Sequence, residues 1–154
     1  LAANVREAIA GALRPAAQAT LIREPGAGWS PLMALAGELV LVDVRTPNEW
    51  LETGIPSTAY SITMHQDPNR FLAELLDKLD NDKARPLALI CRTGTRTAML
   101  QGQLMRIGFP NVYNVAEGVA GSFSGPGWRR WGLPTRMPGE PVQKGPPAPG
   151  PDAA

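Results

Sequence analysis

Two short stretches of the chain, residues 39–42 and 87–90, consist entirely of apolar residues. A strand with one solvent face alternates apolar and polar positions, whereas a strand covered on both faces is apolar throughout. We therefore expect two strands that are buried on both faces. Residues 112–115 form a third strand candidate, and residues 58–62 form a weaker fourth one.

Segments with helical periodicity separate these strands. Asp67 and Pro68 are suited to begin a helix, as its N-cap and its first helical residue. The apolar residues that follow share one helix face: Phe71, Leu72, Leu75, Leu76 and Leu79. A second helix, expected to stop at Gly108, has an apolar face formed by Leu100, Leu104 and Ile107. Strands and helices that alternate at this spacing predict parallel pairing in a layered α/β fold.

The two ends of the chain depart from this pattern. Residues 1–18 are rich in alanine with apolar residues at helical spacing, which predicts an N-terminal amphipathic helix or extension over residues 1–19. Ser30 and Pro31 predict the start of a short helix that ends before Gly37. Residues 137–154 contain six prolines and three glycines, so we expect an extended or disordered tail. The folded domain should then span residues 20–136.

The composition narrows the functional classes. The chain has 154 residues, of which 44% are hydrophobic and 19% charged, and its net charge of +1 gives no reason to expect nucleic acid or an anionic membrane as a partner. No apolar run reaches the length of about 18 residues that marks a membrane span. Cys91 is the single cysteine and His65 the single histidine. These counts exclude an intrachain disulfide, a Cys/His zinc site and CxxC chemistry, and we expect His65 in a surface loop.

Cys91 directly follows the second buried strand and precedes a helix, at the edge of the sheet where ligands of open α/β folds bind. Unpaired amides and the positive end of the helix dipole favour an anion there, so we expect a reactive thiolate. A lone cysteine is often an inert core residue. However, Arg92, Gly94 and Arg96 follow it. Glycine permits a tight anion-binding turn and arginines grip oxyanions, so the reactive interpretation is favoured.

This loop resembles the active-site loop of the rhodanese-like domain family, and other segments resemble the family in the same order. Residues 41–50 (LVDVRTPNEW) are similar to its DVRxxxE signature, and residues 91–96 (CRTGTR) to its CRSGxR loop. Residues 108–115 (GFPNVYNV) resemble its GFxNVYNL segment, and residues 132–134 (GLP) after Trp128 its usual carboxyl end. The departures from the family pattern are Gly54, Ser57, Glu117 and the extra residues 122–127.

The resemblance implies an open five-stranded parallel sheet flanked by helices on both faces. It also implies a sulfurtransferase that carries sulfane sulfur as a persulfide on catalytic Cys91, without a metal or a cofactor. A small anionic donor such as thiosulfate would supply the sulfur, and cyanide, a thiol or a protein would accept it. The implied substrate-binding residues are Arg92, Thr93, Gly94, Thr95 and Arg96.

Three acidic or basic residues outside the loop are expected to support it. Asp43 and Arg45 follow the first buried strand and should form an ion pair that holds the loop, with direct contact to the substrate as the alternative. Glu49 should pair with either Arg92 or Arg96. The expected packing residues include Trp50, Trp128 and Trp131.

Two rival functions stay open at this stage. A rhodanese-like module can serve as a sulfur carrier or a partner-binding domain with little activity of its own. A cysteine phosphatase or arsenate reductase needs a C-x5-R loop, whereas Cys91 and Arg96 form C-x4-R and Ile90 stands where many phosphatases have histidine. The compartment is also open: a lone reactive thiol suits a reducing cytoplasm, and the periplasm after signal removal is the alternative.

Overall fold

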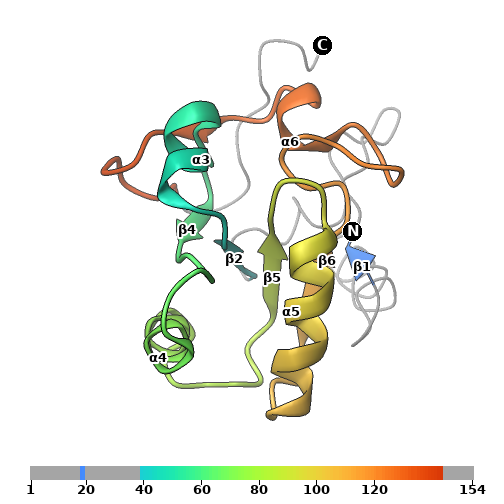
Figure 1. Cartoon of the computed structure of the whole chain (residues 1–154). Coiled ribbons are helices and arrows are strands. Elements are labelled where there is room, and N and C mark those ends of the chain that lie inside the picture. Colours follow the sequence, from blue (N-terminus) through green and yellow to red (C-terminus); the bar gives the residue numbers. More distant parts are fainter. Residues whose placement is uncertain (1–17, 20–38, 144–154) are drawn as a thin grey trace, which may run out of the picture.

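The computed structural model describes residues 18–19 and 39–143, and a parallel sheet forms the centre of this part of the chain (Figure 1). Four strands have three or four residues each, and a two-residue strand, β1, pairs with β6 at one edge. All neighbouring strands of this sheet are parallel. Across the sheet the order is β1 (Gln18–Ala19), β6 (Val112–Val115), β5 (Leu87–Ile90), β2 (Val40–Asp43) and β4 (Ala59–Ser61).

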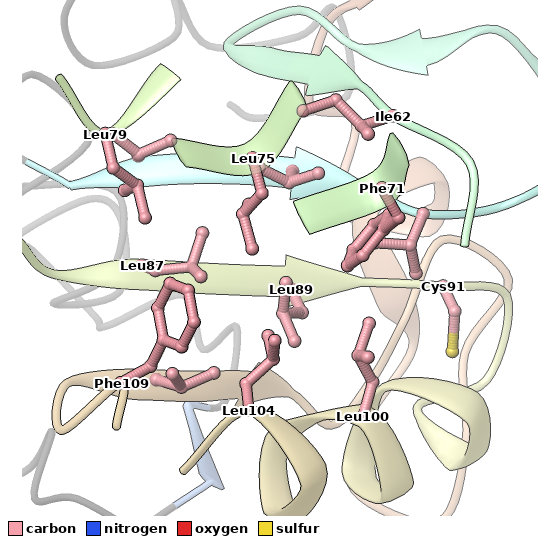
Figure 2. Packing of buried hydrophobic residues seen from close by; sticks show 14 residues of the cluster. Ile62, Phe71, Leu75, Leu79, Leu87, Leu89, Cys91, Leu100, Leu104 and Phe109 are labelled. Carbon is pink, nitrogen blue, oxygen red and sulfur yellow. The ribbon is translucent and has the colours of Figure 1, made fainter. Parts of the chain in front are cut away.

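Helices cover both faces of the sheet, because the central strands are apolar on both sides. Val40 and Val42 of β2 pack into one core cluster, whereas Leu41 packs into the other. The first cluster contains residues of α4 (Pro68–Lys78) and α5 (Thr95–Arg106), and the second contains Trp50 of α3 (Pro47–Thr53) and Trp128 of α6 (Gly127–Arg130). In Figure 2, Leu75 of α4 and Leu100 and Leu104 of α5 lie around Leu89 of β5, and Phe109 lies beside Leu87. The expected α/β fold with strands buried on both faces is confirmed.

Near the carboxyl end of the described chain, β7 (Thr135–Arg136) pairs with β3 (Ile55–Pro56) in a small antiparallel sheet. Arg136 is buried and its guanidinium donates to the carbonyl of Ala59 at 2.8 Å. Residues 137–143, the first part of the predicted tail, return to the domain, where the amide of Gln143 donates to the carbonyl of Ser57 at 2.8 Å. Residues 144–154 lie outside the described residues.

Several boundaries differ from the sequence predictions. Gln18 and Ala19 form a strand instead of the end of a helix, while the rest of the predicted N-terminal helix and the helix at Ser30 lie outside the described residues. Ile107 was expected on the buried face of α5, but the helix ends at Arg106 and Ile107 is 49% exposed, so this expectation was wrong. The short helices α3 and α6 were not predicted. Among the described residues, no helix has the length and apolarity needed to cross a bilayer.

Candidate active site

Cys91 lies immediately after β5, between the end of that strand and the first turn of α5 (Figure 2). Its sulfur accepts a hydrogen bond from the amide of Gly94 at 3.2 Å and lies 3.3 Å from the hydroxyl oxygen of Thr97. The side chain is 1% exposed and packs with the cluster that includes Leu89 and Leu100. Within the described residues, the amide of Gly94 is the one main-chain donor to this sulfur, where the sequence suggested several.

The loop has this shape because Gly94 takes a backbone conformation with φ of 88°, which residues with a Cβ atom rarely adopt. A Cβ atom at this position would also lie 2.3 Å from the carbonyl oxygen of Ala116. Gly94 is the N-cap of α5, so the first-turn amides of that helix have no intrahelical partner. These amides and the helix dipole make the surroundings of the Cys91 sulfur favourable for negative charge.

The side chains that follow Cys91 differ in exposure. Arg92, Thr93 and Thr95 are exposed, whereas Gly94 is buried and Arg96 is partly buried. Arg96 donates to both carboxylate oxygens of Glu49, at 2.9 and 2.8 Å, so the structure selects Arg96 over Arg92 as the partner of this carboxylate. Arg96 also lies 3.1 Å from Nε2 of His65, which is exposed as expected. Arg96 thus connects the loop to α3 and to the segment after β4.

Glu49 belongs to a capping box at the start of α3. The hydroxyl of Thr46 accepts from the amide of Glu49, and the Glu49 carboxylate accepts from the amide of Thr46 at 3.3 Å. The hydrogen bond from Arg96 is the main cause that lowers the pKa of Glu49 from 4.5 to about 2, against the opposing effect of partial burial. The same pairing raises the pKa of Arg96.

This pKa shift predicts how stability depends on pH. A carboxylate whose pKa is lowered in the folded state stabilises the fold above its unfolded pKa, and the stabilisation disappears as pH falls through the folded value. Glu49→Gln should therefore cost about 1 kcal/mol near neutral pH, the scale of a partly exposed ion pair. The difference from the wild type should shrink below pH 4.5 and vanish below about pH 2. Urea denaturation across this pH range measures it.

Glu52→Gln, an exposed carboxylate on the same helix, is the matched control and should show no such pH-dependent difference. Equal losses in Glu49→Gln at both ends of the pH range would contradict the role of the ion pair.

Asp43 and Arg45 form the expected ion pair, and both are buried. The Arg45 guanidinium donates to the two carboxylate oxygens of Asp43 at 3.0 and 2.8 Å. It also donates to the hydroxyl of Thr53 at 2.8 Å and to the carbonyl of Gly54 at 2.9 Å. Arg45 therefore fixes the carboxyl end of α3, the helix that carries Glu49. Among the described residues, no side-chain hydrogen bond joins Asp43 or Arg45 to residues 91–96, and Arg45 supports this loop through α3.

Two departures from the family pattern, Glu117 and the extra residues 122–127, form a single feature of the structure. The buried carboxylate of Glu117 accepts from the amide of Gly127 at 3.1 Å and from the indole of Trp131 at 2.8 Å. A Cβ atom on Gly125 would lie 2.2 Å from the same carboxylate. Glu117 therefore anchors the inserted loop to the end of β6.

The inserted loop forms one wall of a groove of about 770 Å³ beside the loop of Cys91. Phe123 is fully exposed at this wall. Thr93, Gly94 and Thr95 also line the groove, whereas Cys91 does not. The groove therefore reaches the outer surface of the loop and leaves the sulfur covered.

Two further polar residues, Thr97 and Asn114, lie buried beside the sulfur, and neither was predicted as a site residue from the sequence. The Thr97 hydroxyl contacts the Cys91 sulfur, the carbonyl of Gly94 and the side-chain oxygen of Asn114. Asn114 is the polar residue in an otherwise apolar strand segment, β6. A polar side chain at a buried strand position was the available signal, because buried polar groups require partners.

A model of the Rhodanese-like domain matches residues 31–122. The chain belongs to the rhodanese-like domain family. A sulfurtransferase of Allochromatium vinosum is 32% identical over 109 residues, which cover 71% of this chain and 89% of that protein. An uncharacterised protein of Rickettsia prowazekii is 29% identical over 111 residues, covering 67% of this chain and 87% of that protein.

Two solved structures are similar to this rhodanese-like domain. A protein of M. tuberculosis is 28% identical, with a TM-score of 0.50 over 67% of this chain and 89% of that one. A homodimeric polysulfide-sulfur transferase of Wolinella succinogenes is 21% identical, with a TM-score of 0.54 over 92% of this chain and 93% of that one. The last likeness concerns the fold alone. Together with the sulfurtransferase relative, the family membership supports sulfur transfer as the general activity of the chain.

Proposed function

We propose that this protein takes a sulfane sulfur from a small anionic donor such as thiosulfate, holds it as a persulfide on Cys91 and passes it to cyanide or a thiol. The observation that carries the proposal is the position of the sulfur. It accepts from the amide of Gly94, at the N-terminus of α5, where the helix dipole and unpaired amides favour negative charge.

The reaction is a double displacement through a covalent intermediate. The thiolate of Cys91 attacks the outer sulfur of thiosulfate, a new S–S bond forms, and sulfite leaves with the electron pair of the old bond. The negative charge then lies on the outer sulfur of the persulfide. A nucleophilic acceptor attacks this outer sulfur, and Cys91 leaves as a thiolate, so the enzyme returns to its starting state.

The loop residues divide this work. Arg92 is exposed next to Cys91 and has no ion-pair partner among the described residues, so it attracts the anionic donor. Arg96 forms an ion pair with Glu49 and holds the loop in place. Its guanidinium is therefore less available to bind the donor than the sequence suggested. The first-turn amides of α5 receive the charge of the persulfide, within the loop formed by Arg92, Thr93, Gly94, Thr95 and Arg96. Because the sulfur is 1% exposed, this arrangement favours small donors.

The pairing of Arg96 also bears on the phosphatase alternative. A phosphatase loop requires its arginine to grip the oxyanion with parallel hydrogen bonds. Here both ends of the Arg96 guanidinium are directed to Glu49. Turnover of p-nitrophenyl phosphate would support the phosphatase over the sulfurtransferase, and we expect none.

A donor panel with the purified protein tests the proposal. Thiosulfate, an inorganic polysulfide and a low-molecular-weight persulfide are each incubated with the protein, followed by intact mass measurement. We expect thiosulfate to add the mass of one sulfur atom, and cyanide to remove it with formation of thiocyanate. Loading without release to cyanide or small thiols would indicate a carrier module, and no loading by any donor would refute the proposal.

A further inference from the structure

A network of buried, hydrogen-bonded polar atoms lies beside the Cys91 sulfur. The hydroxyl of Thr97 lies 3.3 Å from the sulfur and 3.2 Å from the carbonyl oxygen of Gly94, and it donates to the side-chain oxygen of Asn114. Thr97 and Asn114 are both almost completely buried. Since buried polar groups need partners, the arrangement of protons among these atoms is constrained.

The orientation of the Asn114 amide follows from its second contact. Its nitrogen donates to the carbonyl oxygen of Gly94 at 3.1 Å, and the same carbonyl accepts the amide of Ala98 at 3.1 Å. If the amide were turned over, its oxygen would face the carbonyl oxygen of Gly94, and neither atom could donate. The side-chain oxygen of Asn114 must therefore face Thr97.

The Thr97 hydroxyl has one proton and three neighbours that can accept it. The Asn114 oxygen and the Gly94 carbonyl can only accept, whereas the sulfur of a Cys91 thiol can also donate. In the thiol form, the S–H group donates to Thr97, and Thr97 donates to Asn114. In the thiolate form, Thr97 can donate to sulfur only by giving up its hydrogen bond to Asn114, because a hydroxyl group has a single proton.

We propose that Asn114 is a positioning residue whose side-chain oxygen competes with the Cys91 thiolate for the proton of the Thr97 hydroxyl. The thiolate is then left with the amide of Gly94 as its donor and keeps more of its nucleophilicity, because stabilising a thiolate lowers its intrinsic reactivity. Once sulfur is loaded, the charge moves to the outer sulfur and the Thr97 proton stays with Asn114. This inference rests on the proposed function and assigns a residue outside the loop to it.

Asn114→Leu removes one of the two oxygen atoms that compete with sulfur for the Thr97 proton, and it leaves each remaining polar group a partner. The Gly94 carbonyl keeps the amide of Ala98, and Thr97 can donate to that carbonyl or to the thiolate. The readout is the rate of Cys91 alkylation by iodoacetamide against pH, which is unambiguous because the chain has one cysteine. We expect the midpoint of the profile to move to lower pH by about half to one unit, the effect of one gained hydrogen bond. The plateau rate should fall about two- to threefold.

A double-mutant cycle separates this role from general support of the loop. In a Thr97→Val background, Asn114→Leu should leave the midpoint where it is, because no hydroxyl proton remains to be redirected. Gln101→Leu, which removes another buried amide on α5, is the matched control and should not move the midpoint. A midpoint that Asn114→Leu leaves in place, or moves equally in both backgrounds, would overturn the proposal.

If Asn114→Leu fails to fold, Asn114→Ala gives the same readout, since its smaller side chain needs no new space. The alkylation profile requires no sulfur donor, so it tests the role of Asn114 independently of sulfur transfer. A donor panel without loading refutes sulfur transfer and leaves the alkylation profile interpretable, whereas unchanged profiles refute the role of Asn114 and leave sulfur transfer standing.

Discussion

Replacing Cys91 by serine should abolish sulfur transfer, with a loss of at least about 10³-fold in turnover, the scale seen when a covalent nucleophile is removed. A serine hydroxyl does not ionise near neutral pH, and no other thiol exists in the chain to hold the transferred sulfur. Serine fits the space of cysteine and can accept the amide of Gly94, so the fold should persist. Thiocyanate formation from thiosulfate and cyanide measures the activity, and circular dichroism measures folding.

Met99→Ser provides the control, because Met99 is exposed on α5 outside the loop. This variant should keep the wild-type rate and the mass gain of one sulfur atom after thiosulfate treatment, while Cys91→Ser should show neither. Thiocyanate formation by Cys91→Ser at the wild-type rate would rule out Cys91 as the sulfur carrier and, with it, the persulfide mechanism.

The central strands and the position of Cys91 could be predicted because a single local property determines each. An uninterrupted apolar run has to be covered on both sides, and residues 87–90 of β5 are buried throughout. The end of such a strand lies at the sheet edge where the next helix begins, which places Cys91 at the N-terminus of α5. The helix α3 was missed although Thr46 and Glu49 form the T-x-x-E spacing of a capping box, a signal that the sequence does contain.

Other features of the site depend on contacts between distant segments. From the sequence, Arg92 and Arg96 were equally suitable partners for Glu49. The arrangement of α3 beside the start of α5 selects Arg96, which is 47 residues away along the chain. In the sequence, Glu117 and the extra residues 122–127 are two unrelated departures from the family pattern. In the structure, the buried carboxylate of Glu117 accepts a hydrogen bond from the amide of Gly127 and so connects them. Ile107 fits the apolar spacing of α5, but the helix ends one residue earlier and exposes it.

Replacing Arg45 by methionine should lower the free energy of unfolding by about 3–5 kcal/mol, the cost of removing one partner of a buried ion pair. Asp43 would keep its hydrogen bond from the amide of residue 45 but would lose its counter-charge in a site without solvent exposure. The carbonyl of Gly54 and the hydroxyl of Thr53 would also lose their hydrogen bonds from the Arg45 guanidinium, so the end of α3 would loosen. Such a loss is a large share of the stability of an ordinary domain.

Arg70→Met isolates the effect of burial, because Arg70 forms an ion pair with Glu74 whose side chains are 74% and 41% exposed. Both variants make the same chemical change and break one ion pair, yet water replaces the lost contact only at Arg70. Urea denaturation at neutral pH should therefore show a loss below about 0.5 kcal/mol for Arg70→Met. Similar losses in the two variants would mean that Asp43 and Arg45 do not lie in a closed interior, and that the contacts holding α3 beside the loop of Cys91 come from elsewhere.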